Sequence, residues 1–241
     1  MNNIAGGVPN IYRTGGGHLA NYDAIDLLEG VGIVKFYGGG LAISGGTVQY
    51  RLDRKTFNCS VTVGDASPGP TTQKTTQVSA TSTTYAKLID YDFDSAEINL
   101  PVVLDGTMIT NIPISMTISN DAGTEPIAYV VMTLKRLGTN GTTETDIVST
   151  TSEDVQVSNA PMADQYFAFQ SAVPTTVFKK GEKIRITVEL WGKRAAGAGT
   201  CYFRIGHDPQ GGAVTAVANS VAGFAAGFTE MEFYLPFKID L

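Results

Sequence analysis

The chain has 241 residues, of which 43% are hydrophobic and only 17% are charged, and its formal net charge at pH 7 is −6. An acidic balance of this kind argues against a broad phosphate-binding surface, so we predict no nucleic-acid partner. No run of about 18 consecutive apolar residues is present, which argues against a membrane-spanning helix and a membrane partner. The low charge density beside 27 glycines favours strands and turns over long amphipathic helices.

The first 46 residues differ from the rest of the chain. Glycine clusters surround short apolar pieces, of which "ANYDAIDLLEG" predicts a brief helix ending at Gly30 and "VGIVKFY" predicts a strand. Such a segment can hardly close a core by itself. We therefore interpret residues 1–46 as an extended, glycine-rich N-terminal arm that wraps its own domain or a neighbouring subunit. The start of the chain lacks the basic and apolar regions of a secretory signal.

From Thr47 onward, apolar and polar residues alternate in about eight short stretches, separated by the residues that turns require. The clearest is "EKIRITVELWG", where the apolar residues take one face and the charged or hydroxyl residues take the other. Short strands at regular spacing are typical of jelly rolls and sandwiches. We predict an all-β fold, with residues 47–241 forming one jelly-roll or β-sandwich domain.

Three aspartates, Asp90, Asp92 and Asp94, alternate with large apolar residues in "LIDYDFD", and Glu97 follows them. Because successive side chains on a strand point to opposite faces, burying the apolar residues sends the carboxylates toward solvent. A calcium loop of the EF-hand type is excluded, since its required glycine and glutamate are missing. We interpret the row as the solvated face of a strand, and a looser surface Ca²⁺ site is the alternative.

The histidines and cysteines form no recognisable catalytic or metal-binding motif. His18 and His207 are too few for a zinc site built on imidazole. His207 stands beside Asp208 in "RIGHDPQGG", but the chain has no Gly-x-Ser-x-Gly nucleophile motif, so we interpret this stretch as a turn with His207 at its rim. Cys59 and Cys201 match no metal or redox spacing and are predicted to be small core residues.

Aromatic residues crowd the carboxyl third of the chain. Trp191, the only tryptophan, ends the stretch "ITVELW". The others are Tyr202, Phe203, Phe224, Phe228, Phe233, Tyr234 and Phe237. We interpret them as core and subunit-interface residues, and stacking on a sugar is the alternative. Residues 209–229 carry no charge and are predicted to form a loop that packs against protein.

Four stretches give the second half of the chain a pattern that resembles jelly-roll structural proteins of viruses. They are "IAYVVMTLKRLG", "VFKKGEKIRITVELWG", "FRIGHDPQGG" and "MEFYLPFKIDL". The family includes the minor capsid, cement and decoration proteins of tailed phages and related viruses. The resemblance implies a homo-oligomer, commonly a trimer, that contacts other capsid or virion proteins, and it transfers no functional residue.

We therefore predict a viral structural protein without enzymatic activity, which oligomerises, docks on the virion shell and is assembled in the host cytoplasm. No catalytic, cofactor-binding or metal-binding residue is predicted. The alternative function is a carbohydrate- or receptor-binding β-sandwich module, for example at a phage tail. A hydrolase is the third interpretation, and no nucleophile, metal or base constellation in the sequence supports it.

Overall fold

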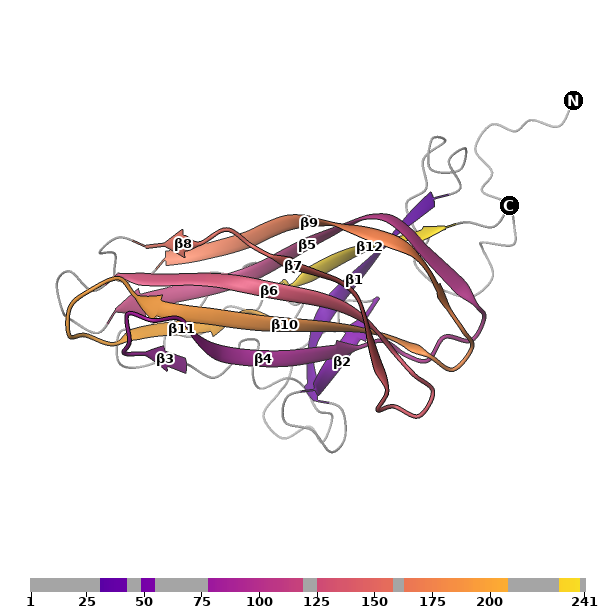
Figure 1. Ribbon diagram of the computed structural model, residues 1–241, viewed down its shortest axis with the longest axis horizontal. Coiled ribbons are helices and arrows are strands. Elements are labelled where there is room, and N and C mark those ends of the chain that lie inside the picture. Colours follow the sequence, from indigo (N-terminus) through magenta and orange to yellow (C-terminus); the bar gives the residue numbers. More distant parts are fainter. Residues whose placement is uncertain are drawn as a thin grey trace, which may run out of the picture.

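The computed structural model describes residues 31–42, 49–54, 78–118, 125–157, 163–207 and 230–238. Across these ranges the chain forms strands and no helix (Figure 1). The strands are β1 (Val31–Ala42), β2 (Gln49–Asp53), β3 (Val78–Ala80), β4 (Ala86–Asp94), β5 (Val102–Ile118), β6 (Pro126–Leu137), β7 (Glu144–Thr151), β8 (Val155–Gln156), β9 (Ala163–Phe178), β10 (Lys183–Arg194), β11 (Cys201–Ile205) and β12 (Glu232–Lys238).

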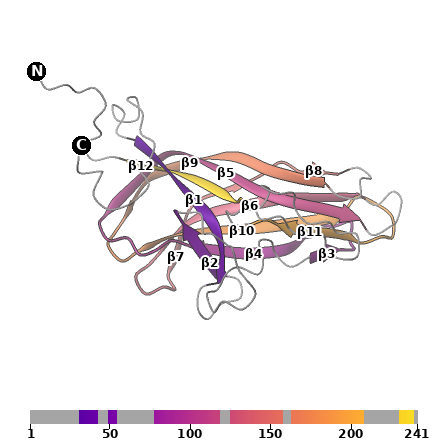
Figure 2. The same ribbon diagram turned by 180° about the vertical axis from the view of Figure 1, so that it is seen from behind.

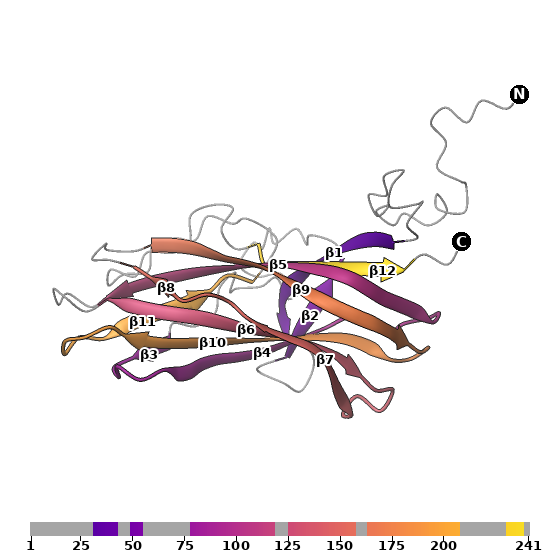
Figure 3. The same cartoon turned by 45° about the horizontal axis from the view of Figure 1, so that its top comes forward.

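The strands form two layers that belong to one continuous sheet (Figure 3). In the first layer, β9 pairs along one edge of β5, while β12 and β11 pair with successive parts of its other edge, and β3 extends β11. The second layer has the order β4-β10-β6-β7, with the short β8 also pairing with β6. This architecture is the predicted all-β sandwich.

β1 joins the two layers. Its first part, Val31 to Tyr37, pairs antiparallel with β12, and its end pairs with β2 across a register shift between Gly38 and Ala42. β2 then runs parallel to β4 of the second layer. Figure 2 shows β1 beside β12, with β2 leading toward β4.

This strand lies within the range predicted as the N-terminal arm, so part of that range is built into the sheet. The boundary at residue 46 stays a prediction. Outside the described residues lie the predicted helix before Gly30, the strand "FNCSVTVG", the charge-free loop at 209–229, His18 and Cys59.

The core lies between the layers because apolar residues recur at every second position of the facing strands. On β6, burial alternates with half-exposure from Pro126 to Leu134. β10 contributes Ile184, Ile186, Val188 and Leu190, all of them buried as the sequence pattern predicted. Phe93, Phe178, Phe203 and Phe233 are fully enclosed and supply much of the packed volume.

Tight turns connect neighbouring strands at one end of the sandwich. In "KKGEK", Gly181 has a φ of 86°, a left-handed conformation that glycine adopts without a steric penalty. Its backbone N–H donates to the carbonyl of Ile98 at 2.8 Å, so the β9–β10 turn is tied to the segment that follows β4. These connections hold β4 and β10 side by side and thereby position the polar groups described next.

Candidate functional site

The aspartate row of β4 meets an arginine on β10. Arg185 lies opposite Asp94 in the strand register, and its Nε and Nη2 donate to the two carboxylate oxygens of Asp94 at 2.5 and 2.6 Å. Arg185 Nη1 donates to Glu144 of β7 at 2.5 Å and lies 3.2 Å from Asp92 Oδ2. Thr187, the next outward residue of β10, donates its hydroxyl to Asp92 at 2.6 Å. We call Arg185, Asp92, Asp94 and Glu144 the Arg185 cluster.

The prediction of a solvated aspartate row is therefore wrong for Asp94. Its side chain is 6% exposed and that of Arg185 is 5% exposed, whereas Asp90 is 48% exposed. Burial alone would lower the pKa of Arg185, but the hydrogen bonds and charges of the neighbouring carboxylates raise it above its ordinary value. The hydrogen bond from Lys135 lowers the pKa of Glu144, with a further contribution from Arg185. Both charged groups are thus held in their ionised forms.

The Arg185 cluster joins β4, β10 and β7 on the outer side of the second layer. Its carboxylates are already paired with a cation, which leaves little capacity for a metal ion. Within the described ranges, no group of three His, Cys, Asp or Glu side chains is arranged to hold a metal. We therefore interpret the cluster as a structural element. Glu97 lies apart from it, 4.0 Å from Lys183 Nζ and 66% exposed.

We had predicted that His207 lies at the rim of a turn, and this prediction is wrong, because the side chain lies in the interior. It is 1% exposed, and its ring packs among those of Tyr50, Tyr91 and Phe93. Its Nδ1 lies 3.1 Å from the carbonyl oxygen of Gly39, which can only accept, so Nδ1 carries the proton. Burial lowers the pKa of His207 to about 4, and the hydrogen bond to Gly39 opposes this only partly. The side chain is a neutral core residue at pH 7.

A cavity of about 530 Å³ opens between β1, β2 and the segment that follows β4. Its lining is largely apolar and includes Phe36, Leu52 and Phe237. Asp53 borders it and has a buried Oδ2 without a hydrogen-bond partner. Burial raises the pKa of Asp53, while the charge of Arg51 lowers it.

A second group of side chains on the outer side of the β4-β10-β6 layer is aromatic. Tyr85 precedes β4, and Trp191 of β10 lies opposite Tyr129 of β6 in the register. The Tyr129 and Trp191 rings are nearly parallel, with 5° between their planes and 6.1 Å between their centres. The Tyr85 ring meets Tyr129 edge-on, with centres 4.8 Å apart. We call these three residues the aromatic cluster.

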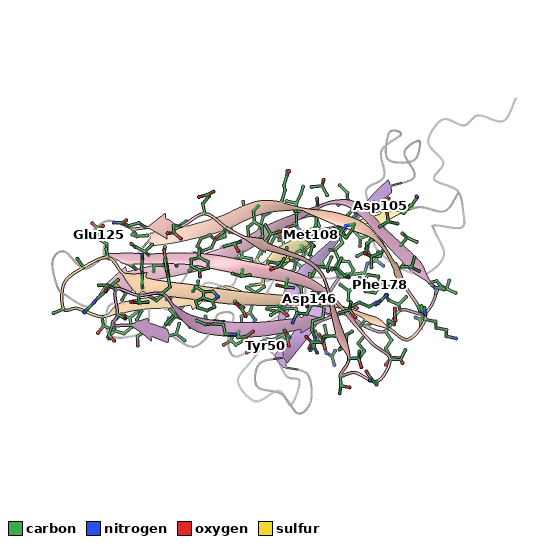
Figure 4. The ribbon with its side chains drawn as sticks, in the orientation of Figure 1. Tyr50, Asp105, Met108, Glu125, Asp146 and Phe178 are labelled. Atoms are coloured by element: carbon green, nitrogen blue, oxygen red, sulfur yellow. The ribbon has the colours of Figure 1, made fainter. Side chains whose placement is uncertain are left out.

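Carboxylates and lysines surround the aromatic cluster. The Trp191 indole N–H donates to Glu189 at 2.9 Å, and the Tyr85 hydroxyl donates to Asp154 at 2.5 Å. Lys193 Nζ lies 4.1 Å from the centre of the Tyr85 ring. Figure 4 labels Glu125, which immediately precedes β6 and marks the end of the molecule nearer to this cluster.

The outer side of the first layer is different, because its exposed residues are mostly uncharged. From Gln165 to Phe178 the chain contains no charged residue. In the middle of β5 and β9 the outward residues are Thr107, Ile109, Asn111, Ala168, Gln170 and Ala172, which we call the β9 face. Within the described ranges, β9 pairs with β5 alone and its other edge has no strand partner.

Beside the β9 face, one lysine and one glutamate are paired with each other. Lys35 of β1 forms an ion pair with Glu232 of β12. The Lys35 ammonium also lies 4.7 Å from the ring centre of Tyr37 and 5.4 Å from that of Tyr234. A depression of about 300 Å³ adjoins this pair, lined by Asn111, Tyr166, Glu230 and Glu232. Glu230 also lines this depression and Asp105 lies on β5, so the surface free of charged side chains is the β9 face itself.

The sequence patterns identified part of these arrangements. Cys201 is a fully buried free thiol, as predicted, and burial raises its pKa to about 11. Phe203 and Phe233 are core residues, as predicted, whereas Trp191 is only half-buried on an outer surface. Sequence reasoning missed Arg185, Tyr85 and Tyr129, since only strand register brings them to their partners. Phe224 and Phe228 lie outside the described ranges.

No family model matches this chain, and no curated protein matches it. Solved structures match at low identity. A CocE/NonD family hydrolase from Staphylococcus aureus is 10% identical with a TM-score of 0.45, over 86% of this chain and 37% of the hydrolase. An α-amino acid ester hydrolase is 11% identical with a TM-score of 0.39, over 85% of this chain and 35% of that protein. The VP2 subviral particle of infectious bursal disease virus is 10% identical with a TM-score of 0.27, over 87% of this chain and 61% of the VP2 chain.

The chain thus spans little more than a third of the hydrolases it matches. With these identities and TM-scores, the similarities assign no activity to the chain. They do correct one prediction, since we had expected no enzymatic activity and the matched structures include hydrolases. The prediction that the protein has no enzymatic activity is therefore withdrawn. The fold is that of an all-β sandwich protein. Besides the hydrolases, the chain has weak similarity to the VP2 protein of infectious bursal disease virus.

Proposed function

We propose that the protein is a structural component of a virion that assembles with further copies of itself through the β9 face. The observation that carries this proposal is the uncharged β9 face on a chain whose net charge is −6. Acidic copies repel one another in most orientations, and the repulsion is weakest where the facing surfaces carry no net charge.

The composition of the β9 face suits burial between protein subunits. Uncharged side chains such as Ala168 and Ala172 lose little hydration when they are covered. The Lys35–Glu232 pair is already formed within one subunit, so covering it leaves no isolated charge.

The remaining parts of the proposal concern the particle. A closed oligomer, for which we propose a trimer, would dock on a capsid shell and act as a minor capsid, cement or decoration protein. The N-terminal residues and the charge-free segment at 209–229 would contact neighbouring virion proteins. We propose assembly in the host cytoplasm followed by a virion location.

Light scattering on the full-length protein at micromolar concentration tests the assembly surface. The wild-type protein is expected to show one discrete mass larger than the monomer. Gln170→Arg places a charge in the middle of the β9 face and should shift that mass to the monomer. The matched control is Thr142→Arg, at an exposed position of the turn between β6 and β7, which should leave the mass unchanged.

Thermal unfolding of both variants checks that the sandwich itself is intact. A monomeric wild-type protein over the whole concentration range would contradict self-assembly. A Gln170→Arg variant that keeps the wild-type mass would contradict the β9 face as the contact.

A further inference from the structure

We propose that the aromatic cluster is a saccharide-binding site that takes pyranose sugars. The site lies on the opposite layer from the β9 face, so it goes beyond the assembly function and does not depend on it. Tyr85 immediately precedes β4, Tyr129 lies on β6 and Trp191 lies on β10. Strand pairing alone brings these three residues together.

The three rings are not core residues. On β6, Ala128 and Val130 are fully buried while Tyr129 between them is half-exposed, which places Tyr129 on the outer side of the sheet. Trp191 and Tyr85 are half-exposed as well. Large aromatic side chains on the outside of a packed layer contribute little to the core, and they are the residue types that bind ligands through their ring faces.

The rings are held in fixed orientations by hydrogen bonds. Glu189 accepts from the Trp191 indole and Asp154 accepts from the Tyr85 hydroxyl, so neither ring turns freely. The parallel rings of Tyr129 and Trp191 are offset, since their centres are 6.1 Å apart, and together they extend the apolar surface across two strands. A preorganised surface loses little conformational entropy when a ligand binds.

The polar groups around the rings match the chemistry of a sugar. A pyranose has an apolar face of C–H groups, which packs on an aromatic ring, and a rim of hydroxyls that donate and accept hydrogen bonds. Glu189 and Asp154 are acceptors on either side of the rings, and Lys87 and Lys193 are donors. Charge-assisted hydrogen bonds of this kind are stronger than those between neutral groups. Lys193 already occupies the Tyr85 face, so Tyr129 and Trp191 provide the stacking surface.

The single tryptophan makes a direct assay possible, because all indole fluorescence reports on this site. An array of pyranose oligosaccharides identifies candidates, and soluble tetrasaccharides of glucose, galactose, mannose and N-acetylglucosamine are then titrated into the full-length protein. We expect a saturable change in Trp191 emission with at least one of them. Tyr129→Ala keeps the fluorophore and should weaken binding about tenfold.

Tyr166→Ala removes a 41% exposed tyrosine from the opposite layer and should leave the affinity unchanged. Trp191→Ala, followed on the array, should abolish binding, whereas Trp191→Phe should retain part of it because the ring is kept. Light scattering on Tyr129→Ala should give the wild-type mass, which separates this site from the assembly surface.

Two results would overturn the proposal. One is the absence of binding to every pyranose on the array and in the titrations. The other is binding with unchanged affinity in both Tyr129→Ala and Trp191→Ala. A loss of the wild-type mass in Tyr129→Ala, without saccharide binding by the wild type, would instead identify the aromatic cluster as a subunit interface.

Discussion

Replacing Arg185 with methionine should destabilise the sandwich more than any change to an exposed ion pair. The substitution keeps much of the side-chain volume and removes the cation. Asp94, whose side chain is 6% exposed, then stays in the protein interior without its two charged hydrogen bonds. An unpaired buried charge is the main cost of such a change.

The size of the loss in unfolding free energy follows from how deeply each carboxylate partner of Arg185 is buried. Breaking a buried pair by removing one member costs about 3–5 kcal/mol. Asp92 and Glu144 are 21% and 34% exposed, so water screens their interactions with Arg185, and together they add at most about 1 kcal/mol. We expect Arg185→Met to lower the free energy of unfolding by about 3–5 kcal/mol.

Urea unfolding followed by circular dichroism, at one protein concentration for all variants, measures this difference. Lys87→Ala is the control, because it removes exposed ion pairs with Asp90 and Glu189 and should cost no more than about 1 kcal/mol. The double variant Arg185→Met, Asp94→Leu should recover at least half of the loss, since no buried charge remains. An Arg185→Met variant within about 1 kcal/mol of the wild type would refute the reasoning.

Two other predictions concern the interior. The pKa of His207 falls from 6.5 to about 4, so the unfolded chain binds the proton more tightly and stability should fall as the pH drops from 6.5 toward 4, by about 3 kcal/mol in total. An NMR titration in a His18→Asn background measures this pKa, and an imidazole that titrates near 6.5 would contradict the burial argument. Gly192→Ala should cost about 1–3 kcal/mol, because the added Cβ would lie 2.6 Å from Leu88 Cδ1 and 3.0 Å from Phe203 Cζ. Calorimetry measures the stability of the Gly192→Ala variant, and an unchanged melting temperature would contradict the prediction by showing that these two side chains can move aside.

Local pattern was sufficient to predict the all-β class and the apolar core face of a regular strand, although it predicted about eight strands where the described residues form twelve. In β10, Ile184, Ile186 and Val188 occupy the buried face that their alternation indicates. The other face was harder to predict, because the same alternation that marks Arg185 as outward says nothing about what covers it. His207 shows a related limit, since its sequence neighbours are typical of a turn while its aromatic neighbours come from β2 and β4.

The amino-acid sequence by itself determined the all-β class, the core residues of the strands and the acidic, low-charge character of the chain, because these depend on side-chain types at a spacing of two residues. Tertiary structure alone decided the pairing of Arg185 with Asp94, the meeting of Tyr129 with Trp191 and the uncharged face that β9 forms with β5. Each of these joins strands that are far apart in the chain, and their register follows from the packing of the whole core.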